Sequence, residues 1–122
     1  MHKSDKQMQK CIEDCMACAQ ACYTMAMHHC LEKGGQHTEP QHFRLMMACA
    51  DVCKTAASVM IAGITQHQLV CAACAEICKA CAESCERIGD MAECVAACQR
   101  CEASCRKMSG KVELAALGTV AH

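Results

Sequence analysis

The chain has 122 residues, a formal net charge of -1 and 16 cysteines. Its length fits one domain, and the core must be built with one Phe, one Tyr and no Trp. The near-neutral charge and the lack of a basic block give no support for nucleic-acid binding. Charges that interrupt the apolar runs predict no membrane span. The start, MHKSDKQMQK, has no apolar export segment, so we expect a cytoplasmic protein with reduced thiols.

Four stretches with helical periodicity follow one another along the chain. Each opens on a capping signal, namely Ser4, Thr38, Thr65 and Asp90, three residues before Gln or Glu. Glycines close the preceding segments. We therefore predict helices over about residues 5–33, 39–62, 66–88 and 91–109. Short connections favour an all-α fold, an antiparallel up-down-up-down four-helix bundle. The predicted domain covers 1–110, and 111–122 form a C-terminal tail.

Cysteines recur at steps of three, four and seven residues, which places them in one stripe on each helix. Large aliphatic residues normally occupy such a stripe. We expect the four stripes to face one another and to line the core with sulfur, with the thiol of Cys30 just off the edge of the first stripe. The candidate metal ligands are Cys11, Cys15, Cys18, Cys22, Cys30, Cys49, Cys53, Cys71, Cys74, Cys78, Cys81, Cys85, Cys94, Cys98, Cys101 and Cys105.

Methionine and histidine lie near the ends of these stripes. In an up-down-up-down bundle, one end gathers Met25, His29, His42, Met46 and Met91, with Cys30 nearby. The opposite end gathers Met8, Met60, His67 and Met108. Thioethers and imidazoles bind soft metal ions without first losing a proton at neutral pH, so both ends suit transient binding. We expect the metal to enter at the first end. His2, His37 and His122 are expected to be solvated.

The thiol pattern favours a soft metal ion. Cu(I) accepts thiolate and thioether ligands at low coordination number. One Cu(I) per thiolate also leaves a dry core neutral, whereas Zn²⁺ on four thiolates leaves two negative charges. Zinc sites usually use C-x2-C knuckles on turns, while the C-x2-C steps here lie within helices. A disulfide scaffold does not suit a reducing compartment. The pattern predicts storage of several Cu(I) ions; a zinc-binding protein and a copper chaperone or sensor that binds few ions remain alternatives.

An iron–sulfur protein is a further alternative. The run from Cys71 to Cys85 superficially has ferredoxin-like spacing, but a ferredoxin run is C-x2-C-x2-C-x3-C-P around a cluster in a loop. Here the spacing is helical throughout, and no Pro follows any Cys. No nucleophile–base pair and no phosphate-binding loop stands out, so we expect no enzymatic activity.

Over about residues 8–109 the chain resembles the bacterial cytosolic copper storage proteins. The resemblance rests on four ordered blocks, CIEDCMACAQAC, ACADVC, CAACAEICKACAESC and CVAACQRCEASC. It implies a homotetramer of four-helix bundles, each storing many Cu(I) ions through the cysteines of these blocks. This chain departs from the family late in the first helix, and its turn ERIGDMAEC lacks the histidine cluster of some relatives.

Overall fold

The computed structural model describes residues 3–110 and 112. Its long helices are α1 (Lys3–Thr24), α3 (Pro40–Ala62), α4 (His67–Ile88) and α5 (Ala92–Met108). A π-helical segment, η1 (Met25–Cys30), extends α1 into the short α2 (Leu31–Lys33), and the 3-10 turn η2 (Gly35–Thr38) leads into α3. No strand occurs among the described residues. The predicted tail, residues 111–122, lies outside them except for Val112.

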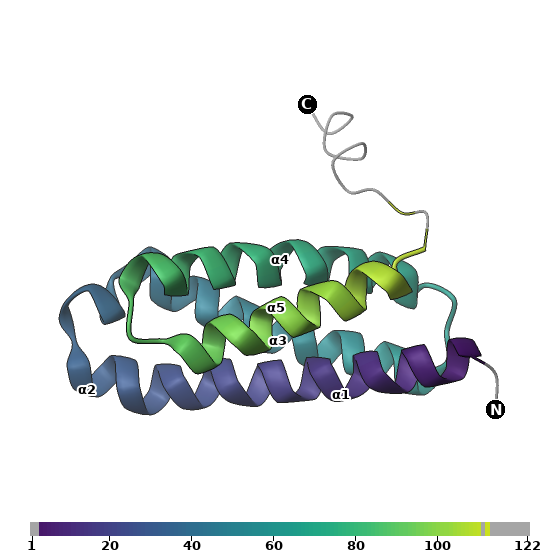
Figure 1. Cartoon of the computed structure of the whole chain (residues 1–122), viewed down its shortest axis with the longest axis horizontal. Coiled ribbons are helices and arrows are strands. Elements are labelled where there is room, and N and C mark those ends of the chain that lie inside the picture. The colour runs from purple at the N-terminus through teal and green to yellow at the C-terminus, as the bar shows by residue number, and fades with distance from the viewer. Residues whose placement is uncertain (1–2, 111, 113–122) are drawn as a thin grey trace.

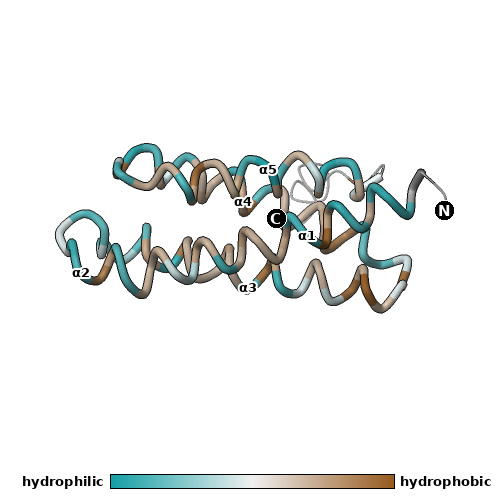
Figure 2. Tube along the Cα trace, turned by 60° about the horizontal axis from the view of Figure 1, so that its bottom comes forward, coloured by the Kyte–Doolittle hydropathy of each residue, from teal (hydrophilic) through white to brown (hydrophobic). Residues whose placement is uncertain are grey.

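The four long helices form the predicted antiparallel bundle (Figure 1). Helix α1 packs against α3 and α5, and α4 packs against the same two helices. Apolar and polar residues alternate along each helix (Figure 2), so that one side of each faces the core. The core is built almost entirely from Cys, Ala and Met. The predicted fold class is therefore confirmed.

Helix α3 is long and apolar enough to cross a membrane by length and composition. The expectation of no candidate span is therefore wrong for this helix by length and composition, although Arg44, Asp51 and Lys54 do interrupt its apolar run. Its buried stripe, however, includes His42, Cys49 and Cys53 and packs against α1 and α4. A core helix of a bundle has this character, because it has to bury one face against its neighbours.

The helix boundaries agree with the sequence within a few residues, but the predicted caps do not. The Glu39 carboxylate, rather than Thr38, accepts hydrogen bonds from the backbone N–H groups of Gln41 and His42, at 3.0 and 2.9 Å. Helix α4 has Gln66 at its N-cap and α5 has Met91, and neither side chain caps. The sequence therefore predicts these turns correctly, but Thr38, Thr65 and Asp90 do not cap the helices that follow, because a cap depends on the backbone angles at the turn.

Gly89 ends α4 with φ 85° and ψ 163°. Only glycine adopts this conformation readily. Asp90 follows with φ 58° and accepts a 3.1 Å hydrogen bond from Lys33 Nζ instead of capping α5. This contact joins the α4–α5 turn to the end of α2, so the two connections at this end of the bundle are held together.

Candidate metal centre

All sixteen cysteines are fully buried and free. They lie on the inward faces of the four long helices and of η1, which the helical spacing predicts for all of them except Cys30. The shortest Sγ–Sγ distances join different helices: Cys15 lies 3.5 Å from both Cys101 and Cys105, and Cys22 lies 3.6 Å from Cys98. Thiols one turn apart on one helix are farther apart, as in Cys11–Cys15 at 4.0 Å. A bound ion can therefore bridge helices as readily as it can bridge one helical turn.

Five groups of three or four thiols have all their sulfur atoms within 4.8 Å of one another. Consecutive groups share members, which makes the series continuous along the bundle axis. Starting near the N-terminus of α1, the groups are Cys11/Cys71/Cys105, Cys15/Cys74/Cys101/Cys105, Cys53/Cys74/Cys78/Cys101, Cys18/Cys49/Cys53/Cys78 and Cys18/Cys22/Cys49/Cys98. Twelve of the sixteen sulfur atoms thus form one connected column, while those of Cys30, Cys81, Cys85 and Cys94 belong to none of these groups.

Hydrogen bonds between thiols divide the cysteines into acidic and basic members. Bonds from Cys22, Cys49 and Cys98 lower the pKa of Cys81 to about 5, because they stabilise its thiolate. At Cys71, contact with Cys105 lowers the pKa, but contact with Cys11 and burial outweigh it and raise the pKa to about 12. Burial raises the pKa of Cys30 as well. A soft cation can replace the proton of such a thiol, and its positive charge then balances the negative charge of the thiolate.

The end of the bundle that includes η1 differs from the prediction in its register. Met25 and His29, expected on the inward stripe, are only partly buried, whereas Ala26 and Cys30 are fully buried. The π-helix is the reason, because its wider turn places Ala26 and Cys30 on the inward face after Cys22. The Cys30 thiol donates to Met46 Sδ at 3.7 Å and to Met91 Sδ at 4.0 Å. The expectation that Cys30 lies off the stripe is therefore wrong.

Three histidines lie at this same end. His42 is fully buried, and its Nδ1 lies 2.7 Å from the Ser84 hydroxyl. Metal-binding histidines commonly tie their second nitrogen in this way. Burial lowers the pKa of His42, which keeps the imidazole neutral. The buried Nε2 atoms of His29, His37 and His42 make no hydrogen bond to the described residues.

Histidine 37 was expected to be solvated, and that expectation is wrong. It is 6% exposed, and its ring meets that of His29 edge-on at 5.1 Å between centroids. The 3-10 turn η2 folds it inward, a placement that no periodicity in the sequence reveals. His29 Nε2 also lies 3.4 Å from Asp90 Oδ2. The histidines of this end come from η1, η2 and α3. This end of the bundle therefore has imidazole groups although the α4–α5 turn contains no histidine.

At the opposite end of the bundle, His67 is only partly buried. Its Nδ1 lies 2.7 Å from the carbonyl oxygen of Ile64, in the turn before α4. Met60 is buried there, while Met8 and Met108 are partly buried. His28 is exposed, and His2 and His122 lie outside the described residues. Of the histidines proposed as ligands, His42 fits the prediction best.

Comparison with known proteins agrees with this site. The family model described as copper storage protein matches residues 4–110. A crystallised protein from Nitrosospira multiformis is 50% identical, with a TM-score of 0.85 over 86% of this chain and 96% of the other. The Cu(I)-bound copper storage protein BsCsp3 is 35% identical, with a TM-score of 0.78 over 85% and 99% of the two chains.

A cytosolic copper storage protein from Streptomyces lividans, in a structure with five coppers, is 32% identical, with a TM-score of 0.72 over 88% of this chain and 96% of the other. No curated protein matches the chain. The four-helix fold and the continuous column of buried thiols define this protein as a metal-storing helical bundle. The chain belongs to the copper storage protein family.

Proposed function

We propose that this protein stores many Cu(I) ions along its thiol column. The single observation that carries the proposal is the chain of five overlapping thiol groups, because each sulfur can serve neighbouring ions. The cysteines of the column bind metal as negatively charged thiolates, and their side chains are buried from solvent. Monovalent copper in nearly equal number to the thiolates leaves it neutral, whereas Zn²⁺ in four-thiolate groups does not. All sixteen cysteines are proposed ligands.

We also propose that copper enters at the end formed by η1 and the N-termini of α3 and α5. The proposed ligands on the entry path are Met25, His29, His42, Met46 and Met91. The Nε2 of His42, which makes no hydrogen bond within the described part of the chain, and the sulfur atoms of Met46 and Met91 support this proposal. His67 is a weaker candidate at the other end, since its Nδ1 already contacts a backbone carbonyl.

Anaerobic titration of the reduced protein with Cu(I), followed by metal analysis and a thiol count, tests storage. We expect at least seven ions per chain, one for each C-x3-C pair in the sequence, rising toward one per cysteine. Saturation at one or two ions would favour a chaperone or sensor. An iron chromophore with acid-labile sulfide in freshly isolated protein would favour an iron–sulfur protein.

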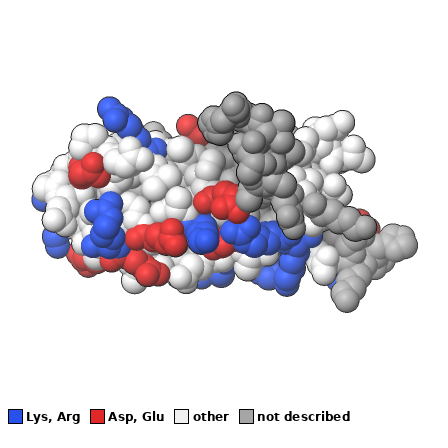
Figure 3. All heavy atoms as spheres, turned by 90° about the horizontal axis from the view of Figure 1, so that it is seen from above, with Lys and Arg blue, Asp and Glu red and all other residues white. Residues whose placement is uncertain are grey.

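The cellular setting proposed is the cytoplasm, where thiols stay reduced and a store limits free copper. The proposed role is binding and not catalysis. The storage domain is proposed to span residues 1–110, with 111–122 as a tail. On the face shown in Figure 3, basic and acidic side chains are interspersed, which gives no support for a nucleic-acid surface there.

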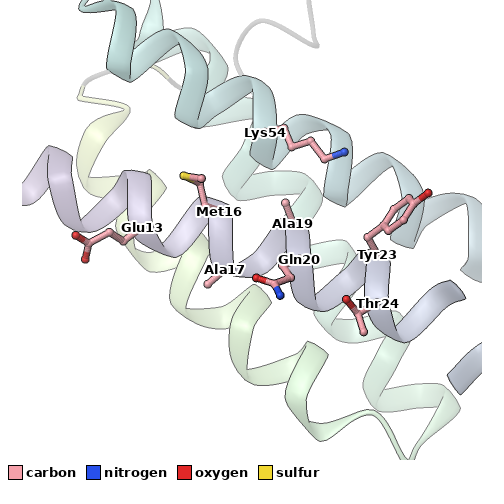
Figure 4. A pocket seen from close by; sticks show the side chains of 8 residues that line it. All are labelled: Glu13, Met16, Ala17, Ala19, Gln20, Tyr23, Thr24 and Lys54. Carbon is pink, nitrogen blue, oxygen red and sulfur yellow. The ribbon is translucent and has the colours of Figure 1, made fainter. Parts of the chain in front are cut away.

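The proposed quaternary state is a homo-oligomer, a tetramer by resemblance to the family. A surface pocket of about 660 Å³ between α1 and α3 is a candidate contact for a second copy (Figure 4). Its lining includes the exposed side chains of Met16 and Tyr23, with Lys54 Nζ 5.4 Å from the Tyr23 ring centroid. Glu13 also lines it, so a twofold contact could pair Glu13 of one copy with Lys54 of the next.

Light scattering tests this contact. Met16→Glu should lower the molar mass of the particle in solution, while Leu31→Glu, also at an exposed position but outside the pocket, should not. A wild-type protein with the mass of one chain would contradict the proposal.

A further inference from the structure

One thiol in the bundle has thioether neighbours. Cys30 donates to Met46 Sδ at 3.7 Å and to Met91 Sδ at 4.0 Å, and all three side chains are at most 2% exposed. Cys30, like Cys81, Cys85 and Cys94, belongs to none of the five thiol groups. It is distinguished by its two thioether contacts, and these three sulfur atoms are called here the Cys30 cluster.

Three elements build this cluster. The π-helix η1 turns Cys30 inward, Met46 lies one turn after His42 on α3, and Met91 precedes α5 at its N-cap. π-helical turns within α-helices often occur at functional sites. In a regular α-helix, the stripe through Cys22 would continue through Met25 and His29 instead. The backbone irregularity is therefore what brings a thiol to the two methionines.

The spacing of the cluster suits a three-coordinate ion. Metal–sulfur bonds of about 2.3 Å in a flat trigonal arrangement separate the sulfur atoms by about 4 Å, close to the 3.7 and 4.0 Å distances from Cys30. One thiolate balances the charge of one Cu(I). A divalent ion would keep a net positive charge in a dry core, and thioethers are soft ligands that suit Cu(I) and not zinc.

We propose that Cys30, Met46 and Met91 bind one Cu(I) and select it over Zn²⁺ at the end of the thiol column. The proposal rests on the proposed storage function, which it deepens by assigning metal selection to this cluster. The neighbouring His42 Nε2 is fully buried and has no hydrogen-bond partner among residues 3–110, so it is a further neutral ligand on the same helix face. The cluster carries one negative charge at most, from the Cys30 thiolate, so it provides little electrostatic stabilisation for a divalent zinc ion.

Methionine-methyl NMR on protein labelled with ¹³C at the methionine methyl groups tests the proposal without a mutation. Met60 is the matched control, because it is buried on the same helix α3 and packs against the same core, but no thiol donates to it. Filling the protein with Cu(I) should shift the methyl signals of Met46 and Met91 well beyond that of Met60. Zn²⁺ should leave the Met46 and Met91 signals in place.

Equal shifts at Met46, Met91 and Met60, or a zinc shift as large as the copper shift, would overturn the proposal even if the chain bound many copper ions. Binding of only one or two Cu(I) per chain would instead contradict storage itself. The two failures are therefore distinguishable.

Variants give a second measurement. Met46→Leu with Met91→Leu preserves side-chain volume and removes both thioethers, so we expect the loss of about one Cu(I) per chain. Loading from a Cu(I) chelator in excess Zn²⁺ should also slow relative to Met60→Leu. Unchanged capacity and an unchanged rate in zinc would contradict a metal-binding role for the two methionines. Circular dichroism confirms that each variant is folded.

Discussion

Among single residues, His42 has the clearest geometry of a transient ligand. Its Nδ1 contacts Ser84, to which Arg87 also donates at 3.4 Å, and its Nε2 makes no hydrogen bond to the described residues. The ring is thus fixed by one nitrogen while the other stays available. His29 lies nearer the surface, with Asp90 and His37 as neighbours. This order, from the rim to the buried ring, is what a path for an ion requires.

Replacing His29 and His42 together by Ala should slow Cu(I) loading roughly tenfold, because transient ligands are lost, and should leave the final capacity nearly unchanged. Stopped-flow transfer from a coloured Cu(I) chelator measures the rate. His28→Ala is the matched control, since His28 is an adjacent but exposed residue. Equal rates in the double variant and in the control, with slowing on loss of His67 instead, would place the path at the other end.

Thiol protonation predicts how copper binding depends on pH. The pKa of Cys71 is about 12 and that of Cys30 is raised by burial, so both are protonated at pH 7 and release a proton when copper binds. The pKa of Cys81 is about 5, so copper binding at Cys81 releases almost no proton at pH 7. Retention of copper against a chelator should therefore weaken as pH falls, and most steeply below about pH 5. Proton release of zero on loading would contradict this assignment.

At the level of elements, the α4–α5 turn fixes the end where Met91 lies. Gly89 has backbone angles that only glycine adopts readily, while Gly63 ends α3 in the left-handed helical region, with φ 77° and ψ 21°. Neither glycine has an atom within 4 Å of the position of an added Cβ. Any cost of substitution there comes from the backbone and not from a clash.

Gly89→Ala should lower the free energy of unfolding by about 1–3 kcal/mol. Gly63→Asn should cost less, because Asn tolerates the left-handed helical region. Chemical denaturation of the reduced, metal-free protein measures both. A Gly89→Ala variant as stable as the wild type would mean that the turn relaxes freely, and the position of Met91 would then not depend on it.

At the scale of the whole molecule, the bundle has a core without metal. Thiols, alanines and methionines fill the interior, and each long helix packs against two others. Zinc fingers differ, because they lack such a core and fold only with metal. A protonated thiol such as that of Cys71 carries no charge, and hydrogen bonds from neighbouring thiols stabilise the thiolate of Cys81, so the empty column does not oppose folding.

The reduced, metal-free protein should therefore give a far-UV circular dichroism spectrum dominated by helix. Cu(I) should raise the melting temperature progressively as it binds, because it binds the folded state and not the unfolded one. Oxidised protein, in which cross-helix disulfides can form, is the control for effects of the thiols alone. A coil-like spectrum for the reduced apo-protein would show that metal builds the fold.

The sequence alone determined the four helices, their antiparallel order and the inward direction of fifteen cysteines, because helical periodicity is a local property that a stripe of thiols displays plainly. Tertiary structure decided which thiols meet across helices, as with Cys15 and Cys105, since such contacts depend on how the helices are packed. It also decided the places of Cys30 and His37. A π-helical segment and a 3-10 segment rotate side chains away from the positions that a regular α-helix would give them, and the spacing of residues in the sequence predicts neither segment.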